Sequence, residues 1–155
     1  MNWDAMGAVA EMLGAFAVFI SLIYLAIQTK QNTKALRSAA FQQVRDSFSN
    51  VSMAMAQDPK LGSLLRRVAN NEELSEDEVS QTNFLLTTLI RKGESAYFQS
   101  YDGTLQRESW LAIRVTLLGG LSSSYAKSWL LESRARFTKE YIDDLIEGLG
   151  IEGSA

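Results

Sequence analysis

The stretch Met12–Thr29, MLGAFAVFISLIYLAIQT, decides the fold, because its eighteen residues include no charged side chain. As an α-helix it would be about 27 Å long, which nearly matches the ~30 Å hydrocarbon core of a membrane. The apolar run already begins at Ala5–Ala10, and Glu11 is its one charged residue. We therefore expect residues 1–29 to form a transmembrane anchor.

Aromatic residues at the two ends of this segment predict that the helix spans the membrane. Trp3 and Tyr24 are 21 positions apart, which is roughly 32 Å along a helix. Tryptophan and tyrosine are enriched at both membrane–water interfaces, and this separation is close to the distance between them. A helix lying flat on the surface would not need this spacing.

Charged residues on either side of the segment predict its direction. Asp4 precedes it, and three basic residues follow it: Lys30, Lys34 and Arg37. Because basic flanks stay on the cytoplasmic side, we expect the N-terminus outside and the rest of the chain in the cytoplasm. The three basic residues share one helix face and can contact anionic lipid headgroups. A cleaved signal peptide would need a basic start, whereas this start is acidic.

Small residues recur along one stripe of the apolar helix. Their spacings are 3, 4, 3 and 4, at Gly7, Ala10, Gly14, Ala17 and Ser21. Such a stripe lets another helix approach closely, and this packing drives association in lipid. We expect a helix–helix interface here. Its partner is another copy of the chain or a different membrane protein, and closed homo-oligomers are the commoner outcome.

Glu11 lies beside the small-residue stripe, one position after Ala10. An ionisable group at membrane depth is a functional candidate by default, as an interface acid or as part of an ion path. Glu11 is also close to the outer end of the apolar run, where a side chain reaches the interface easily. Packing or snorkelling is therefore the favoured interpretation, and a pore with Glu11 near its mouth is the alternative.

The region after the anchor has a helical apolar period. Residues 30–57 carry apolar side chains three or four positions apart: Leu36, Ala40, Val44, Phe48, Val51 and Met55. This spacing predicts an amphipathic linker helix. Because neither glycine nor proline intervenes before Pro59, we expect this helix to continue directly from the anchor.

Start and stop signals along residues 58–148 predict a helical cytoplasmic domain. In chain order they are Asp58-Pro59, which starts a helix through about Ala69, the turn Asn70-Asn71, the capping box Ser75–Glu78, the turn Asp102-Gly103, a start near Gln106 and the break Gly119-Gly120. Two more helices should contain Tyr125 and Trp129, and Phe137 and Tyr141, before a frayed glycine-rich end at 149–155. Because no segment alternates with period two, the expected class is all-α.

A group of three acidic residues and one single glutamate are candidates for chemistry. Glu76–Glu78 fall in the first turn of a predicted helix, where the helix dipole favours negative charge, so we interpret them as a cap. Glu94 lies in a helix with a buried pattern. We expect it to pair internally with Arg91, Arg114 or another basic group, because buried charges need a partner.

A serine-rich turn and a set of aromatic residues are candidate ligand sites. Gly119–Ser124 could present amides to a phosphate, but it lacks the lysine and spacing of a P-loop, so a turn with serine capping is favoured. Aromatic residues at helical spacing could line a groove, although they normally build a core. They are Trp110, Tyr125, Trp129, Phe137 and Tyr141.

Composition argues against several function classes. The net charge is −3, from 15 basic and 18 acidic residues, so nothing resembles the basic stripe that neutralises nucleic-acid phosphates. The chain has no cysteine and no histidine, which removes thiolate nucleophiles, Cys/His zinc sites and the usual general base near neutral pH. We expect no enzyme activity, no cofactor, no metal and no nucleic-acid partner.

The chain resembles a group of small, uncharacterised bacterial membrane proteins over nearly its whole length. The resemblance rests on residues 2–42, on Asp58-Pro59, on ESAYFQ at 94–99, on Asp102-Gly103, on Trp110 and on WLLESRARFT at 129–138. It implies an anchor with a helical domain in the bacterial inner membrane, and it supplies no catalytic residues.

These patterns together predict a bitopic inner-membrane protein that self-assembles through its Gly/Ala stripe and acts as a structural or interaction module. Two alternatives remain open. One is an oligomeric ion channel, although beyond Ser21, Tyr24 and Gln28 the helix offers no polar stripe for a lumen. The other is an accessory subunit whose stripe docks on a foreign membrane complex.

Overall fold

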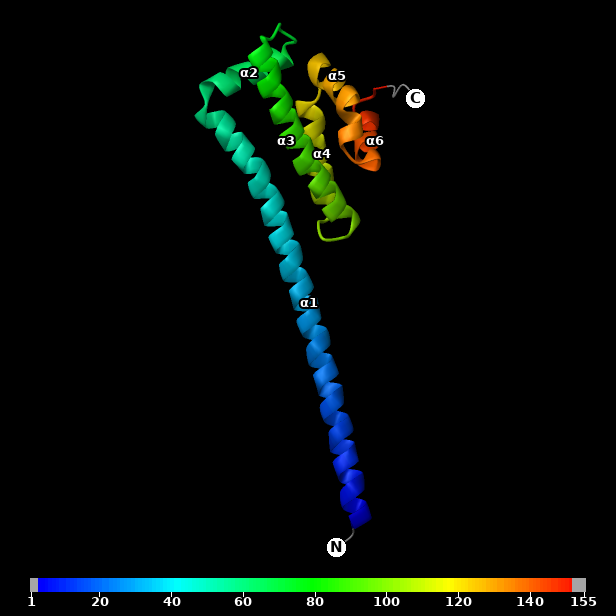
Figure 1. The fold of residues 1–155 in the computed structure, drawn as a ribbon. Coiled ribbons are helices and arrows are strands. Elements are labelled where there is room, and N and C mark those ends of the chain that lie inside the picture. Colours follow the sequence, from blue (N-terminus) through cyan, green and yellow to red (C-terminus); the bar gives the residue numbers. More distant parts are fainter. Residues whose placement is uncertain (1–2, 152–155) are drawn as a thin grey trace. The chain divides into compact units, whose positions relative to one another are not determined.

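The computed structural model describes residues 3–151, which form helices and no β-strand (Figure 1). The expected all-α class is confirmed. In chain order the elements are α1 (Trp3–Gln57), α2 (Pro59–Ala69), α3 (Glu76–Tyr101), α4 (Arg107–Gly120), α5 (Ser124–Ser133), the 3₁₀ helix η1 (Arg134–Arg136) and α6 (Lys139–Gly148).

The chain divides into two units, residues 1–38 and residues 39–155. The described part of the first unit consists of α1 alone. The second unit contains the end of α1 and all the later helices. Helix α1 is continuous to Gln57, as predicted from the lack of glycine and proline between residues 15 and 58.

Local hydrogen bonds explain where α2 begins and ends. The Asp58 Oδ1 atom accepts a hydrogen bond of 2.9 Å from the backbone N–H of Lys60, and Pro59 occupies the first helical position. Just past Ala69, Asn71 has a φ of 55°. Asparagine tolerates this left-handed conformation better than most residues, which is why the helix can turn here.

Helices α3 and α4 run side by side in opposite directions, and α5 and α6 pack against them (Figure 1). The turn after α3 contains Gly103 with a φ of 78°, a conformation that favours glycine. The core between these helices is apolar and aromatic. Its most deeply buried large side chains are Ile90, Leu105, Leu130, Tyr141, Ile142 and Leu145.

At the end of α1, Val44 and Phe48 pack in this core, whereas Met55 packs in a separate apolar cluster with residues of α2. Ala40 and Val44 are buried, and Phe48, Val51 and Met55 are half-buried. These are five of the six positions that the apolar period predicted. The sixth, Leu36, belongs to the first unit and is exposed.

The last part of the chain differs in detail from the expectation. Phe137 precedes α6 in extended conformation, with φ −128° and ψ 166°, because η1 interposes a tight turn. After α6, Gly150 has a φ of 61°, and the backbone N–H of Ile151 donates to the Ile146 carbonyl at 3.2 Å. The segment expected to fray therefore begins with an ordered glycine cap. Residues 152–155 lie outside the described residues.

Candidate functional site

The large apolar side chains near the start of α1 are exposed in the structure. The helix is long and apolar enough to span a membrane, and none of its most apolar window is buried. The exposed large apolar side chains between Trp3 and Ile27 keep 46% to 69% of their surface accessible. A core helix of a soluble protein would bury such residues, whereas a membrane span or an N-terminal signal sequence leaves them exposed within the chain.

The predicted small-residue stripe is exposed in the described part of the first unit. All five members, Gly7, Ala10, Gly14, Ala17 and Ser21, are exposed. A Cβ atom added at Gly7 or Gly14 would meet nothing within 4 Å. The Ser21 hydroxyl donates to the Ala17 carbonyl at 2.9 Å, so its proton is already satisfied. Packing within the described part of the first unit therefore does not explain why these positions are small.

The charged residues of the first unit are also exposed. Glu11 has no ion-pair partner among residues 3–151, and it is the single charged residue between Asp4 and Lys30. The basic cluster of Lys30, Lys34 and Arg37 is exposed on the same helix. As the spacing predicted, these three side chains project from one side of α1.

Glu94 is buried and paired, as expected for an internal charge. Its Oε2 atom lies 2.8 Å from Arg91 Nη1, and its Oε1 atom accepts from the Thr138 backbone N–H at 2.7 Å. Burial opposes the charged form, but these hydrogen bonds outweigh it and hold the pKa of Glu94 below its usual value. Arg114, the other predicted partner, instead bonds Asp144 at 2.6 Å.

The Glu94 pair also fastens α3 to the segment before α6. Arg91 donates to the Arg136 carbonyl at 2.7 Å and lies 4.6 Å from the centre of the Phe137 ring. The guanidinium group of Arg91 is therefore paired with partners within the domain. These contacts make Glu94 and Arg91 a structural connection between helices.

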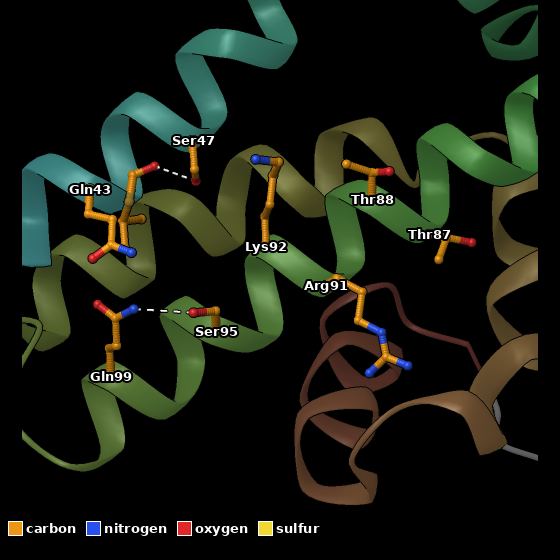
Figure 2. A pocket seen from close by; sticks show the side chains of 9 residues that line it. Gln43, Ser47, Thr87, Thr88, Arg91, Lys92, Ser95 and Gln99 are labelled. Carbon is orange, nitrogen blue, oxygen red and sulfur yellow. Dashed lines mark hydrogen bonds between the residues drawn. The ribbon is translucent and has the colours of Figure 1, made fainter.

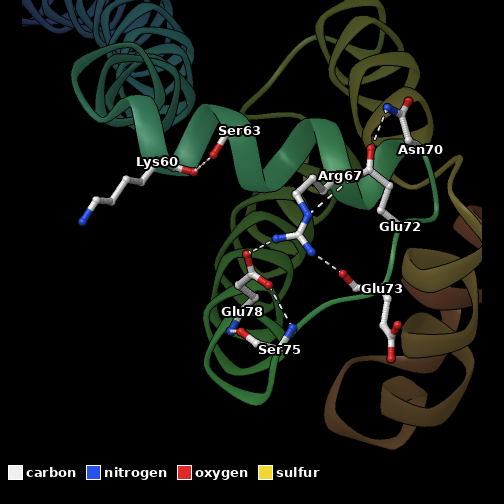
Figure 3. Close-up of polar contacts among 8 residues, drawn as sticks. All are labelled: Lys60, Ser63, Arg67, Asn70, Glu72, Glu73, Ser75 and Glu78. Atoms are coloured by element: carbon white, nitrogen blue, oxygen red, sulfur yellow. Dashed lines mark hydrogen bonds and ion pairs between the residues drawn. The ribbon is translucent and has the colours of Figure 1, made fainter.

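The acidic residues 76–78 form a helix cap. Ser75 and Glu78 make both bonds of the predicted capping box. Arg67 of α2 joins them by hydrogen bonds to the Glu78 carboxylate and to the Glu73 carbonyl, and it lies 3.4 Å from Glu72 (Figure 3). The cluster closes the turn between α2 and α3.

The serine-rich turn is also structural. The Ser123 hydroxyl accepts from the Ala126 N–H at 3.2 Å and so caps α5. The Ser124 N–H donates to Asn71 Oδ1 at 2.8 Å. Because Asn71 takes the place that an anion would occupy at this amide, the turn connects α5 to the α2–α3 loop and is not open to a phosphate.

The aromatic residues build the core, as the sequence favoured. Trp110 and Tyr141 are buried with ring centres 6.0 Å apart, and Trp129 contacts Phe137 with ring centres 6.3 Å apart. Tyr125 is half-buried and donates from its hydroxyl to Asn83 Oδ1 at 2.8 Å. Burial raises the pKa of Tyr141, whose hydroxyl has no hydrogen-bond partner among the described residues.

Sequence reasoning missed two grooves in the second unit, one on each side of Val44. The larger, about 510 Å³, lies between α1 and α4 and is mostly apolar, with Phe41, Phe48 and Ile113 among its lining residues. The smaller, about 400 Å³, lies between α1 and α3 and has a polar lining (Figure 2). The smaller groove has one feature that could have indicated it in the sequence. This feature is a row of polar residues about one helical turn apart on α3: Lys92, Ser95 and Gln99.

Comparisons with known proteins add no relative. The chain matches no protein-family model, no curated protein and no solved structure. Within residues 3–151, no group of three histidine, cysteine, aspartate or glutamate side chains is placed to hold a metal ion.

Proposed function

We propose that this chain is a single-span membrane protein that self-associates through the small-residue stripe of α1. It acts as a structural or interaction module, without catalysing a reaction, through the helical domain that follows. The observation that carries the proposal is the apolar surface of α1 between Trp3 and Ile27, which is exposed although the later helices form an ordinary buried core.

A lipid environment suits both the apolar and the polar side chains of this helix. Burying apolar surface releases about 25 cal/mol per Å², and the exposed row of leucine, isoleucine and phenylalanine offers a large area. The hydroxyls of Ser21 and Thr29 donate to carbonyls one turn earlier, at 2.9 Å and 2.8 Å. Neither polar proton is left unsatisfied in hydrocarbon.

The flanking charges give the proposed orientation. Asp4 at one end and the basic cluster at the other favour an N-terminus outside and a cytoplasmic domain. The bacterial inner membrane is the proposed location, because the sequence pattern resembles that of small bacterial membrane proteins. The basic cluster then contacts the anionic headgroups of the inner leaflet.

Self-association is supported by the open space at Gly7 and Gly14. Because no described residue of the first unit fills it, a second helix can approach the backbone there, which small residues permit and large ones prevent. A two-fold dimer places identical stripes face to face. Glu11 lies beside this contact and can pair with a polar group across it.

The test is the mass of the full chain in mild detergent, for two variants with the same change. Ala17→Ile places a branched side chain in the stripe. Ala15→Ile makes the same change two residues away, about 160° around the helix. We expect Ala17→Ile to weaken dimerisation about tenfold or more, and Ala15→Ile to leave it within about twofold of wild type.

Three results of that experiment would count against self-association through the stripe. Equal effects of the two variants would mean that the stripe is not the contact. A strict monomer that binds a different membrane protein through Ala17 would instead support docking on a foreign complex. A monomer that copurifies with nothing from native membranes would overturn both forms of the proposal.

A further inference from the structure

The smaller groove of the second unit is lined by polar and basic residues that have no role in the proposed self-association. It lies between residues 43–47 of α1 and residues 87–99 of α3, with a volume of about 400 Å³. That volume is within the range of small-molecule sites. None of its lining residues is acidic, whereas Arg91 and Lys92 are both basic.

The two basic residues differ in whether they are already paired. Arg91 is held by Glu94 and by the Arg136 carbonyl. Figure 2 shows its side chain and that of Lys92 leaving α3 in different directions. Lys92 is half-buried, and no carboxylate within residues 3–151 pairs with it. A half-buried ammonium group without a counter-ion attracts an anion.

The other polar residues that line the groove offer mainly acceptor atoms. The hydroxyls of Ser47, Thr87 and Thr88 donate to carbonyls of their own helices, at 2.7 Å to 2.8 Å, which leaves their lone pairs available. Gln99 donates from Nε2 to Ser95 Oγ at 3.2 Å. Its Oε1 atom is buried and has no hydrogen-bond partner among the described residues.

An unpaired buried acceptor requires a donor, and a bound ligand can supply one. Lys92 and Gln99 are seven residues apart on α3, which corresponds to about 10 Å along the helix and to the same face. A ligand in this groove would therefore carry a negative charge at one end and a hydroxyl group near the other.

We propose that this groove binds a phosphate ester of a small polyol, with the phosphate on Lys92 and a hydroxyl donating to Gln99 Oε1. Phosphate is favoured over carboxylate because the available cation is an ammonium point charge, whereas planar carboxylates are matched best by the guanidinium fork of arginine. Such an ester occurs as a free metabolite and as the headgroup of phosphatidylglycerol, which share this chemistry.

The first experiment titrates glycerol 3-phosphate into the full chain in an uncharged detergent and follows backbone amides by NMR. Saturable shifts are expected at Lys92, Ser95 and Gln99. Lys92→Met should weaken binding about tenfold. Lys127→Met is the matched control, because Lys127 is also half-buried and lies on α5, away from the groove. It should leave the affinity unchanged.

A second variant separates the hydroxyl contact from the charge. Gln99→Leu should weaken glycerol 3-phosphate about threefold to tenfold while leaving inorganic phosphate, which has no polyol hydroxyl, unaffected. Amide spectra of the unliganded variants confirm that each is folded. Two results would overturn the proposal. One is equal affinity of Lys92→Met and Lys127→Met for glycerol 3-phosphate, and the other is an equal loss of affinity for glycerol 3-phosphate and inorganic phosphate in Gln99→Leu.

The source of the ester is resolved with the full chain in nanodiscs. Discs of phosphatidylcholine alone are compared with discs that also contain phosphatidylglycerol, each with and without added glycerol 3-phosphate. Shifts at Lys92, Ser95 and Gln99 caused by phosphatidylglycerol identify a lipid headgroup, and shifts caused only by the free ester identify a soluble ligand. If neither probe shifts these amides, the groove does not bind this class of molecule.

Discussion

Gly14 and Gly93 are both glycines within helices, yet their surroundings differ completely. A Cβ atom added at Gly93 would collide with the Tyr141 hydroxyl and would lie 2.5 Å from Leu117 Cδ1. A Cβ atom added at Gly14 would meet nothing within 4 Å. The domain needs its small residue for its own packing. The apolar helix has glycines that no described neighbour requires, which supports the proposed contact with a second copy.

The largest expected effect comes from filling the space at Gly93. Gly93→Ala should lower the free energy of unfolding of the domain by about 3 kcal/mol, because the new methyl group overpacks against Tyr141 and Leu117. Urea denaturation followed by the aromatic circular dichroism signal measures it. Gly119→Ala is the control, since a Cβ atom there meets nothing within 4 Å. It should be neutral or slightly stabilising, and equal losses would contradict the comparison.

Glu94→Gln should lower the free energy of unfolding by less, about 2 kcal/mol near neutral pH. The charged hydrogen bonds to Arg91 and to the Thr138 N–H are both weakened. The pKa of Glu94 is lower in the folded chain than its ordinary value of 4.5. Its stabilising contribution is therefore complete above about pH 4.5 and is lost as the pH falls through the lower folded-state pKa.

Denaturation curves of wild type and Glu94→Gln at several pH values test this dependence. The difference between the two proteins should shrink steadily below about pH 4.5. Arg91→Met, which removes the partner, should show the same trend. A difference that stays constant with pH would mean that the charge of Glu94 contributes nothing to the domain.

The smallest of these effects is expected at Asn71, which combines a φ of 55° with a hydrogen bond to the Ser124 N–H. Asn71→Ala should destabilise the domain by about 1.5 kcal/mol, through the lost bond and the strained backbone. Asn71→Gly loses the bond but tolerates the conformation, so it should cost roughly half as much. If glycine costs as much as alanine, the backbone conformation does not matter at this turn.

Local signals made most of the helix boundaries predictable. Asp58-Pro59, Ser75–Glu78 and Asp102-Gly103 fix helix ends through hydrogen bonds and dihedral preferences of neighbouring residues, and the structure places the ends there. The tight turn of η1 was missed, since RAR at 134–136 carries neither glycine nor proline to mark a helix end.

Contacts between helices were much harder to predict. Spacing indicated that Glu94 needs a basic partner and could not choose between Arg91 and Arg114, because that choice depends on how the helices pack. The groove beside Lys92 was missed for the same reason. Its polar row on α3 has the ordinary spacing of a solvent-exposed helix face, and only the position of α1 makes it one wall of a groove.

The central claim is that the stripe of α1 contacts a second copy, and disulfide cross-linking in native membranes tests it most directly. The chain has no cysteine, so single cysteines can be placed at Ala10 and Ala17 in the stripe and at Met12 and Phe19 about 160° away. We predict strong dimer bands for the first two positions and weak bands for the other two. Equal cross-linking at all four positions, or stronger cross-linking at Met12 and Phe19, would contradict the account.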